Sequence, residues 1–240
     1  MGYNKYYSYD VQDGSMEFPA TFAKVIRNVY FWMACGLTMT ALVALLVFKN
    51  TNLMATLLTS RSLIWILCIA EIGLVLWLSA RIDKMSSTTA GIMFAVYALL
   101  NGVTMSFIFL AYTTESIATT FFITAGTFAV MSLIGYTIKK DLSGMGRILM
   151  MLLIGLVIAT VVNIFVKSSG FAILLNYVGV LVFVGLTVYD TQKIKVMVRD
   201  ACMNGNEEQI TKLALMGSLS LYLDFINLFL MLLRIFGSRR

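Results

Sequence analysis

Histidine is absent from this 240-residue chain, and proline and charged residues are scarce. Without histidine, the common zinc sites, Ser-His-Asp triads and imidazole proton relays are excluded. Carboxylates are then the side chains left to titrate near neutral pH, and we do not expect an enzyme. The three cysteines, Cys35, Cys68 and Cys202, are too few and too widely spaced for a disulfide framework.

Charged residues make up only 12% of the chain, whereas 60% of the residues are apolar. A soluble domain carries about 25% charged residues, so water is not the main solvent of this protein. A bilayer core of roughly 30 Å needs about 20 apolar residues per helix, and membrane β-strands would alternate in polarity, which these runs do not. We predict an all-α membrane protein with seven transmembrane helices at Val25–Phe48, Ser62–Ala80, Gly91–Tyr112, Ile117–Ile138, Arg147–Val166, Phe171–Asp190 and Leu213–Phe236.

The predicted organisation is a polar amino-terminal tail, residues 1–24, followed by one seven-helix domain, residues 25–240. The tail has no apolar stretch ending in a small-residue cleavage site, so we expect no cleaved signal peptide. The net charge of +6 comes from loops between apolar runs, which favours membrane lipid and no nucleic acid as a partner. The short loops favour a bacterial inner membrane.

Lysine and arginine are distributed unevenly between the two sides of the predicted bundle, with most of them on the side of the amino terminus. The positive-inside rule therefore places the amino terminus in the cytoplasm and the carboxyl terminus outside. The basic carboxyl-terminal tail, with Arg234, Arg239 and Arg240, weakens this assignment. A last helix that re-enters the membrane without crossing it is the alternative.

Asp224 lies near the middle of the last apolar run, about 18 Å along a helix from Lys212. A carboxylate at the bilayer centre costs at least about 2.5 kcal/mol on insertion scales, so such a residue is by default a functional candidate. On a helix, Gly217, Ser220, Asp224 and Asn227 share one face, because they recur at spacings of three and four. We expect this face to point into the protein.

Asp190 ends the sixth apolar run, and the sixth and seventh runs are neighbours joined on the predicted cytoplasmic side. We therefore predict that Asp190 and Asp224 meet in the cytoplasmic half of the bundle. Two carboxylates at hydrogen-bonding distance resist double ionisation, so they would share a proton and titrate as a coupled pair. Two alternatives stay open: Asp190 is a helix-end residue paired with a nearby basic side chain, or Asp224 forms a structural ion pair with Arg81.

Oxygen-bearing side chains in the apolar runs indicate a cation pathway, since hard divalent cations prefer oxygen ligands. Glu71 falls midway through the second run, and we place it on this pathway together with Ser220 and Asn227. We expect Asp190 and Asp224 to contact the transported cation, with no resident cofactor. The alternative for Glu71 is a hydrogen bond to a hydroxyl and nothing more.

Two segments resemble the transmembrane Bax-inhibitor-motif family: Val188-Tyr189-Asp190-Thr191-Gln192-Lys193-Ile194, and Leu221-Tyr222-Leu223-Asp224-Phe225-Ile226-Asn227-Leu228-Phe229 followed by Leu232-Leu233-Arg234. The resemblance implies a bundle whose last helix is central and surrounded by the other six. It also implies a pH-sensitive passive calcium leak gated by Asp190 and Asp224, with Arg81 resembling the arginine that exchanges salt bridges with them. Bacterial members are also described as modulators of a membrane-anchored AAA protease, which gives a binding role as the alternative function.

Two other membrane classes share single features with the chain. Intramembrane aspartyl proteases carry Tyr-Asp in one helix and Gly-x-Gly-Asp in the next; Tyr189-Asp190 matches the first motif, but Leu221-Tyr222-Leu223 precedes Asp224 where the second needs glycines. Protease activity is therefore a remote alternative. A retinal-binding protein needs a lysine inside the last helix, and Lys212 lies only at its edge.

Overall fold

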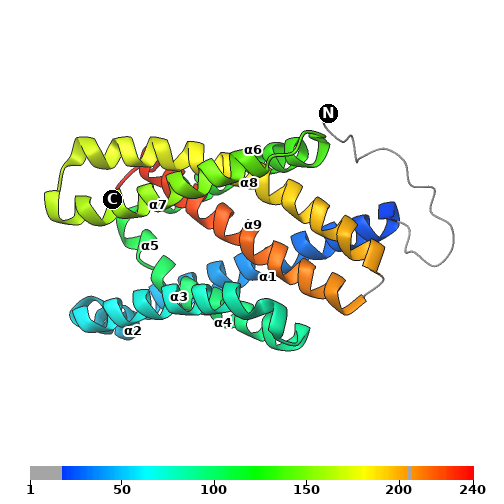
Figure 1. The fold of residues 1–240 in the computed structure, drawn as a ribbon. Coiled ribbons are helices and arrows are strands. Elements are labelled where there is room, and N and C mark those ends of the chain that lie inside the picture. Colours follow the sequence, from blue (N-terminus) through cyan, green and yellow to red (C-terminus); the bar gives the residue numbers. More distant parts are fainter. Residues whose placement is uncertain (1–17, 205–206) are drawn as a thin grey trace.

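The computed structural model describes residues 18–204 and 207–240, and almost all of these are helical. Seven helical segments in this part of the chain are long and apolar enough to cross a membrane, which confirms the predicted fold class. In chain order the elements are α1 (Phe18–Lys49), α2 (Thr51–Thr59), α3 (Arg61–Arg81), the short 3-10 helix η1 (Ile82–Lys84), α4 (Ser87–Met105), α5 (Ile108–Ala111), α6 (Thr114–Thr137), α7 (Ser143–Val166), α8 (Ser169–Asn204) and α9 (Glu207–Phe236) (Figure 1).

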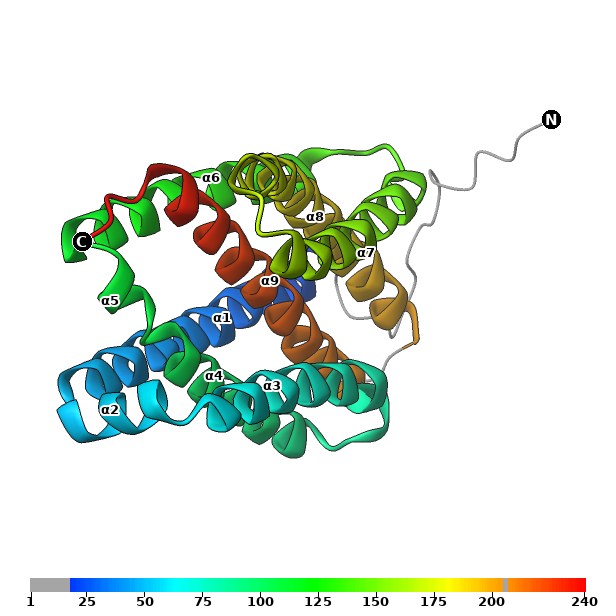
Figure 2. The ribbon, with the colours of Figure 1, turned by 90° about the vertical axis from the view of Figure 1, so that its left-hand side faces the viewer.

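The last helix, α9, runs between two groups of helices, α1 to α4 on one side and α6 to α8 on the other (Figures 1 and 2). It is the most enclosed span: 56% of its apolar window is buried, against 6% for α3 and 11% for α7. Its main packing partners are α8, α1, α6 and α4, whereas α3 packs mainly on α4 and α7 on α8. Enclosure of the last helix by all six others is thus not confirmed, because four helices make most of its contacts.

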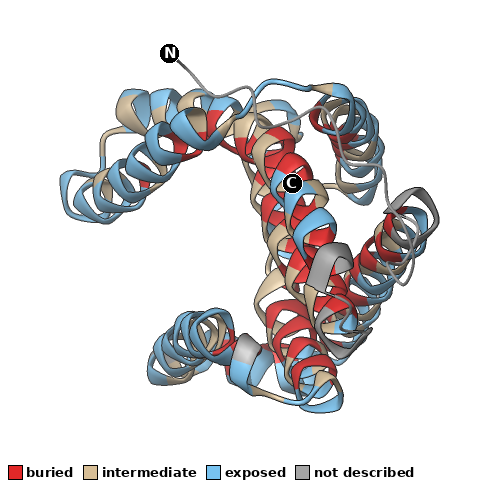
Figure 3. Ribbon diagram, turned by 45° about the vertical axis from the view of Figure 1, so that its right-hand side comes forward, coloured by how far each residue is buried: buried red, intermediate tan, exposed pale blue. Residues whose placement is uncertain are grey.

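Burial follows the same arrangement, with buried residues concentrated along α9 and the sides of the helices that face it (Figure 3). The outer faces of α3 and α7 are exposed in the isolated chain. Large apolar side chains on these faces, such as Trp65 and Phe165 with exposed fractions of 58% and 79%, suit contact with lipid. The core around α9 is therefore where polar side chains are kept from lipid.

The sixth membrane helix is longer than the sequence predicts. The predicted end at Asp190 is wrong, because α8 continues to Asn204. The predicted start of the last helix at Leu213 is also wrong, because α9 begins at Glu207. Apolar residues spaced three or four apart let the two extensions pack as amphipathic helices, although their mean polarity is high. These buried residues are Ile194, Val198, Ala201, Ile210 and Ala214.

Other parts of the chain also differ from the predictions. Helix α1 begins at Phe18, inside the predicted tail, and the short helix α2 occupies the first connection. The third apolar run breaks at Ser106, whose hydroxyl donates to the Val103 carbonyl at 2.6 Å, so α4 and α5 replace one continuous helix. None of these changes alters the number of membrane crossings.

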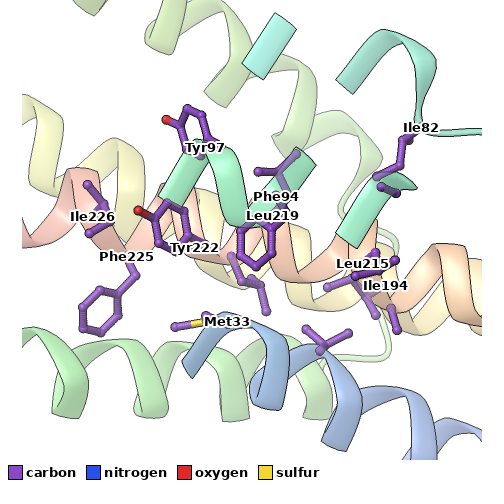
Figure 4. Close-up of a cluster of buried hydrophobic side chains, with 14 of the residues drawn as sticks. Met33, Ile82, Phe94, Tyr97, Ile194, Leu215, Leu219, Tyr222, Phe225 and Ile226 are labelled. Carbon is purple, nitrogen blue, oxygen red and sulfur yellow. The ribbon is translucent and has the colours of Figure 1, made fainter. Parts of the chain in front are cut away.

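The carboxyl-terminal tail lies against the connection between α5 and α6. Tyr112 and Arg239 form an isolated antiparallel bridge, and the Arg240 amide donates to the Ala111 carbonyl at 3.1 Å. The other end of α9 packs near η1, and Ile82 and Leu215 both belong to the buried hydrophobic cluster in Figure 4. Helix α9 thus crosses the bundle from end to end, which argues against a re-entrant last helix.

Gly135 permits a close crossing of α6 and α8, and we predict that Gly135→Ala destabilises the protein. A Cβ there would meet the Val188 carbonyl oxygen, which is backbone, and would lie 3.0 Å from the Thr191 Cβ. We expect a cost of about 1–3 kcal/mol, measured as a lower Tm of the purified protein in detergent. Gly126→Ala on the same helix is the control, since nothing lies within 4 Å of its Cβ position. Equal Tm values for the two variants would contradict this close crossing.

Candidate functional site

Glycines at the interface of α8 and α9 show the register in which these two antiparallel helices pack. Gly217 of α9 faces Ile194 of α8, and Gly179 of α8 faces Met231 of α9. A Cβ at either glycine would come within 3.0 Å of the facing side chain, so the two helices approach closely at both points. In this antiparallel register, Asp190 of α8 is level with Ser220 of α9, about one helical turn from Asp224.

Asp190 and Asp224, which we call the acidic pair, lie on the sides of α8 and α9 that pack together. Lys193, one turn along α8, and the Ser220 hydroxyl of α9 are the groups that act electrostatically on the Asp190 carboxyl. The charge that acts on Asp224 is Asp190 itself. The structure thus brings the two predicted aspartates together, near mid-length of both helices and not at a helix end.

Asp224 is the more deeply placed carboxyl of the acidic pair. Only 5% of it is exposed, and its Oδ2 has no hydrogen-bond partner among the residues that the structure describes. An unpaired charge buried in this way is costly, and a proton shared with the neighbouring carboxyl would remove one of the two charges. The arrangement is therefore suited to bind one proton between two helices.

Arg81 is separate from the acidic pair in this conformation. It is the last residue of α3, where it is exposed. Within the described part of the chain, the charged groups that act on the pair are Lys193 and the two carboxylates, so the structural ion pair between Arg81 and Asp224 is not formed here. An exchange of partners with Arg81 would require α3 and α9 to move relative to each other.

The other predicted pathway residues are divided around α9. Glu71 of α3 is half-buried and accepts a hydrogen bond of 2.8 Å from the Thr104 hydroxyl of α4. This is the hydrogen bond to a hydroxyl that the sequence offered as the alternative role of Glu71. Asn227 lies on a half-buried face of α9 and donates from its amide nitrogen to the Leu223 carbonyl at 2.8 Å. Of these residues, Ser220 is the one that acts on the Asp190 carboxyl.

A buried tyrosine network, which the sequence did not predict, joins α9 to α1 and α4. The Tyr222 hydroxyl lies 2.7 Å from the Thr40 Oγ1 and donates to the Asn101 Oδ1 at 3.2 Å. Thr40 in turn donates to the Ala98 carbonyl at 3.0 Å. Because Tyr222 lies two residues from Asp224, the two side chains point to different sides of α9. The network therefore fixes the side of α9 away from α8.

Aromatic rings pack around this network. The Tyr222 ring is fully buried and meets the rings of Phe94 and Tyr97 edge to face, with centroid distances of 5.5 and 5.9 Å (Figure 4). Charge on Glu71 also acts on Tyr97 and Tyr222, which places that carboxylate near the tyrosine network and not near the acidic pair. The sequence signal for this network was Tyr222 itself, because it places a hydroxyl group inside the last apolar run.

Residues that follow Asp190 attach α8 to the connection between α6 and α7. The Gln192 amide donates to the Lys140 carbonyl at 2.6 Å and accepts from the Leu142 amide at 2.9 Å. Lys195 donates to the Tyr136 carbonyl at 2.8 Å. The sequence alone indicated no role for Gln192; in the structure it fixes the position of α8 beside Asp190.

A tightly held metal ion would need more ligands than this site provides. Within residues 18–204 and 207–240, no group of three or more Cys, Asp or Glu side chains is placed to hold a metal. Calcium takes six to eight oxygen ligands in a stable site, whereas the acidic pair and Ser220 supply two carboxylates and a hydroxyl. The site can attract a cation electrostatically without enclosing it.

Comparisons with known proteins agree with this architecture. The family model described as "Inhibitor of apoptosis-promoting Bax1" matches residues 22–240. The chain is 50% identical over 215 residues to the "Inner membrane protein YbhL" of Escherichia coli, covering 90% of this chain and 92% of that one. It is also 43% identical to an uncharacterized protein of Borreliella burgdorferi, covering 90% and 93% of the two chains. A membrane protein of Streptococcus pyogenes is 36% identical over 212 residues, which cover 88% of this chain and 90% of that protein.

Proposed function

The chain belongs to the Bax inhibitor family of multi-pass membrane proteins, and from this premise we propose that it is a pH-sensitive passive calcium leak. The observation that carries the proposal is the acidic pair: two carboxylates on adjacent helices, one of them 5% exposed, at mid-length of the most enclosed span. Intramembrane carboxylates in transport proteins mark ion and proton pathways. The membrane in this proposal is a bacterial inner membrane, with the amino terminus in the cytoplasm.

Calcium is the cation that this interior suits best. The polar groups around α9 are carboxylates, hydroxyls and amides, which are hard oxygen ligands, and the chain has no imidazole. Two carboxylates attract a divalent cation more strongly than a monovalent one, and their incomplete ligand set lets it leave. Passive movement down a gradient therefore needs no further chemistry from the protein.

Protons act on the same pair in this proposal. A shared proton holds Asp190 and Asp224 together, so acidification favours the conformation in which α8 and α9 lie as they do here. When the proton leaves, the two negative charges repel, and Arg81 is the candidate, by family resemblance, to take one carboxylate. The equilibrium between two arrangements of α8 and α9 is then set by pH.

Asp141 does not account for a response near neutral pH. Asp141, in the exposed connection between α6 and α7, accepts hydrogen bonds from the Ser143 hydroxyl at 2.6 Å and amide at 2.9 Å. These bonds lower the pKa of Asp141 below its usual value, so it stays ionised across the neutral range. Any contribution of Asp141 to stability is present above about pH 4 and is lost only at lower pH.

The proposal is tested by calcium flux into vesicles that contain only the purified protein. We expect flux that depends on protein and on pH between about 6 and 8, with empty vesicles as the control. A membrane-anchored AAA protease that co-purifies with the chain, together with no flux from the purified protein, would favour the binding role. Peptide cleavage lost on Asp224→Asn would instead favour an intramembrane protease.

Glu71→Gln should lower calcium flux about two- to tenfold while the pH response stays unchanged. The amide keeps the hydrogen bond from Thr104 but removes a negative charge from the cation pathway, and a charge of this kind concentrates cations locally. Flux in vesicles measures the effect, and Glu115→Gln, at an exposed position in the first turn of α6, is the matched control. Equal flux for parent and Glu71→Gln would remove Glu71 from the pathway.

A further inference from the structure

A cavity of about 270 Å³ lies at the end of the bundle away from the α8–α9 connection. It is bounded by the end of α7, the start of α8, the end of α9 and the carboxyl-terminal tail. The acidic pair is not among its lining residues. Six of the residues that line it carry polar groups: Tyr112, Thr160, Asn163, Asn176, Arg234 and Arg239.

The charge at this cavity is positive. Arg234 and Arg239 supply two guanidinium groups, and the described residues that line the cavity include no Asp or Glu. The nearest acidic residue in sequence to Tyr112 is Glu115, which is exposed at the start of α6 and outside the lining. Two arginines facing one space without a carboxylate in its wall favour an anion as the occupant.

Amide groups in the wall add hydrogen-bond donors. The Asn163 Oδ1 accepts from the Ser168 amide at 3.2 Å, which leaves its NH₂ group to donate at the cavity. Asn176 stands on α8 in the same wall. Guanidinium forks and amide NH₂ groups together match the several acceptor oxygens of a phosphate better than a single chloride ion.

The tail holds one side of the cavity in a defined position. Besides the bridge between Tyr112 and Arg239, the Thr113 amide donates to the Ser238 carbonyl at 3.2 Å, and the Ser238 amide donates to the Ser116 Oγ at 3.0 Å. These bonds fix the backbone that carries Arg239 before any ligand binds, so less conformational freedom is lost on binding. Arg234 is fixed similarly by the last turn of α9.

We propose that this cavity binds a phosphate group, either of an anionic lipid headgroup or of free phosphate. The cavity lies where the apolar spans of α7, α8 and α9 end, which is the depth at which lipid phosphates lie in a bilayer. Basic pockets between transmembrane helices are a known form of headgroup recognition. The two sources share the same chemistry at the arginines and are separated by experiment.

The test measures binding to the full-length protein in detergent by native mass spectrometry. The ligands are phosphatidylglycerol, the matching diacylglycerol without the phosphate, and inorganic phosphate. We expect the double variant Arg234→Gln/Arg239→Gln to weaken phosphate-dependent binding about tenfold or more. Asn176→Asp, which adds a negative charge to the wall and keeps both arginines, should do the same. Arg147→Gln removes an exposed arginine at the other end of α7 and should leave binding unchanged.

Each outcome bears on the proposal. Phosphatidylglycerol bound more tightly than diacylglycerol and than inorganic phosphate identifies a lipid headgroup site. Inorganic phosphate bound as tightly as the lipid identifies a site for free phosphate. The proposal fails if phosphatidylglycerol binds no better than diacylglycerol and inorganic phosphate does not bind, or if both cavity variants bind as the parent does.

Discussion

Asparagine in place of either Asp190 or Asp224 should abolish most of the pH dependence of calcium flux. Asparagine has nearly the shape of a protonated aspartate and cannot ionise, so each variant lacks one of the two charges at every pH. We therefore expect each variant to conduct at all pH values as the parent does at its acidic limit. A single shared proton can change an equilibrium at most about tenfold per pH unit, which sets the size of the response lost.

Flux in vesicles across about pH 6 to 8 is the measurement for these variants. Asp200→Asn is the matched control, because Asp200 is exposed on the same helix as Asp190 and outside the acidic pair. It should keep the parent's pH response. If Asp190→Asn and Asp224→Asn both kept that response, the pair would not be the proton-sensitive element. A response lost in only one variant would assign the proton to that carboxyl alone.

Truncation of Tyr222 should destabilise the protein strongly, because this side chain joins three helices. Tyr222→Ala removes a fully buried ring that packs against Phe94 and Tyr97, a cost of about 3–5 kcal/mol. Tyr222→Phe keeps the ring but leaves the Asn101 Oδ1 without its donor, a cost of about 1–3 kcal/mol. The Tm of the purified protein in detergent should therefore fall furthest for Tyr222→Ala and less for Tyr222→Phe.

Tyr177→Ala is the control for Tyr222, because its side chain is 55% exposed on α8. We expect its Tm to stay close to that of the parent. A Tyr222→Ala variant as stable as Tyr177→Ala would show that the tyrosine network does not hold α9 against α1 and α4. The buried position of the ring would then contribute little to stability.

Much of the fold was predictable because the bilayer limits the choices. Apolar runs of sufficient length must form helices, so the seven spans followed from hydropathy alone. The extension of α8 beyond Asp190 was not predicted, since its high polarity hid the spacing of Ile194 and Val198 along one face. The packing of α9 on four helices was also beyond reach, because it depends on close approaches such as that at Gly217.

The site was predictable to the extent that depth and helix face decide it. Asp224 was singled out from its position in the last run, and the order of the helices led us to expect it near Asp190, whose charge acts on it in the structure. The end of α8 was placed too early, so Asp190 lies within that helix and not at its end. Tyr222 and Gln192 were missed, since their partners Thr40, Asn101 and Lys140 are distant in sequence and their hydrogen bonds appear only in three dimensions.

We propose that Asp190 and Asp224 share a proton that is gained or lost near neutral pH. Infrared difference spectroscopy of the purified protein between about pH 6 and 8 tests it most directly, because a protonated carboxyl has its own C=O stretching band. We expect this band to change with pH in the parent and in Asp200→Asn, and the change to be absent from the double variant Asp190→Asn/Asp224→Asn. An unchanged pH-dependent band in that double variant, or none in the parent, would contradict it.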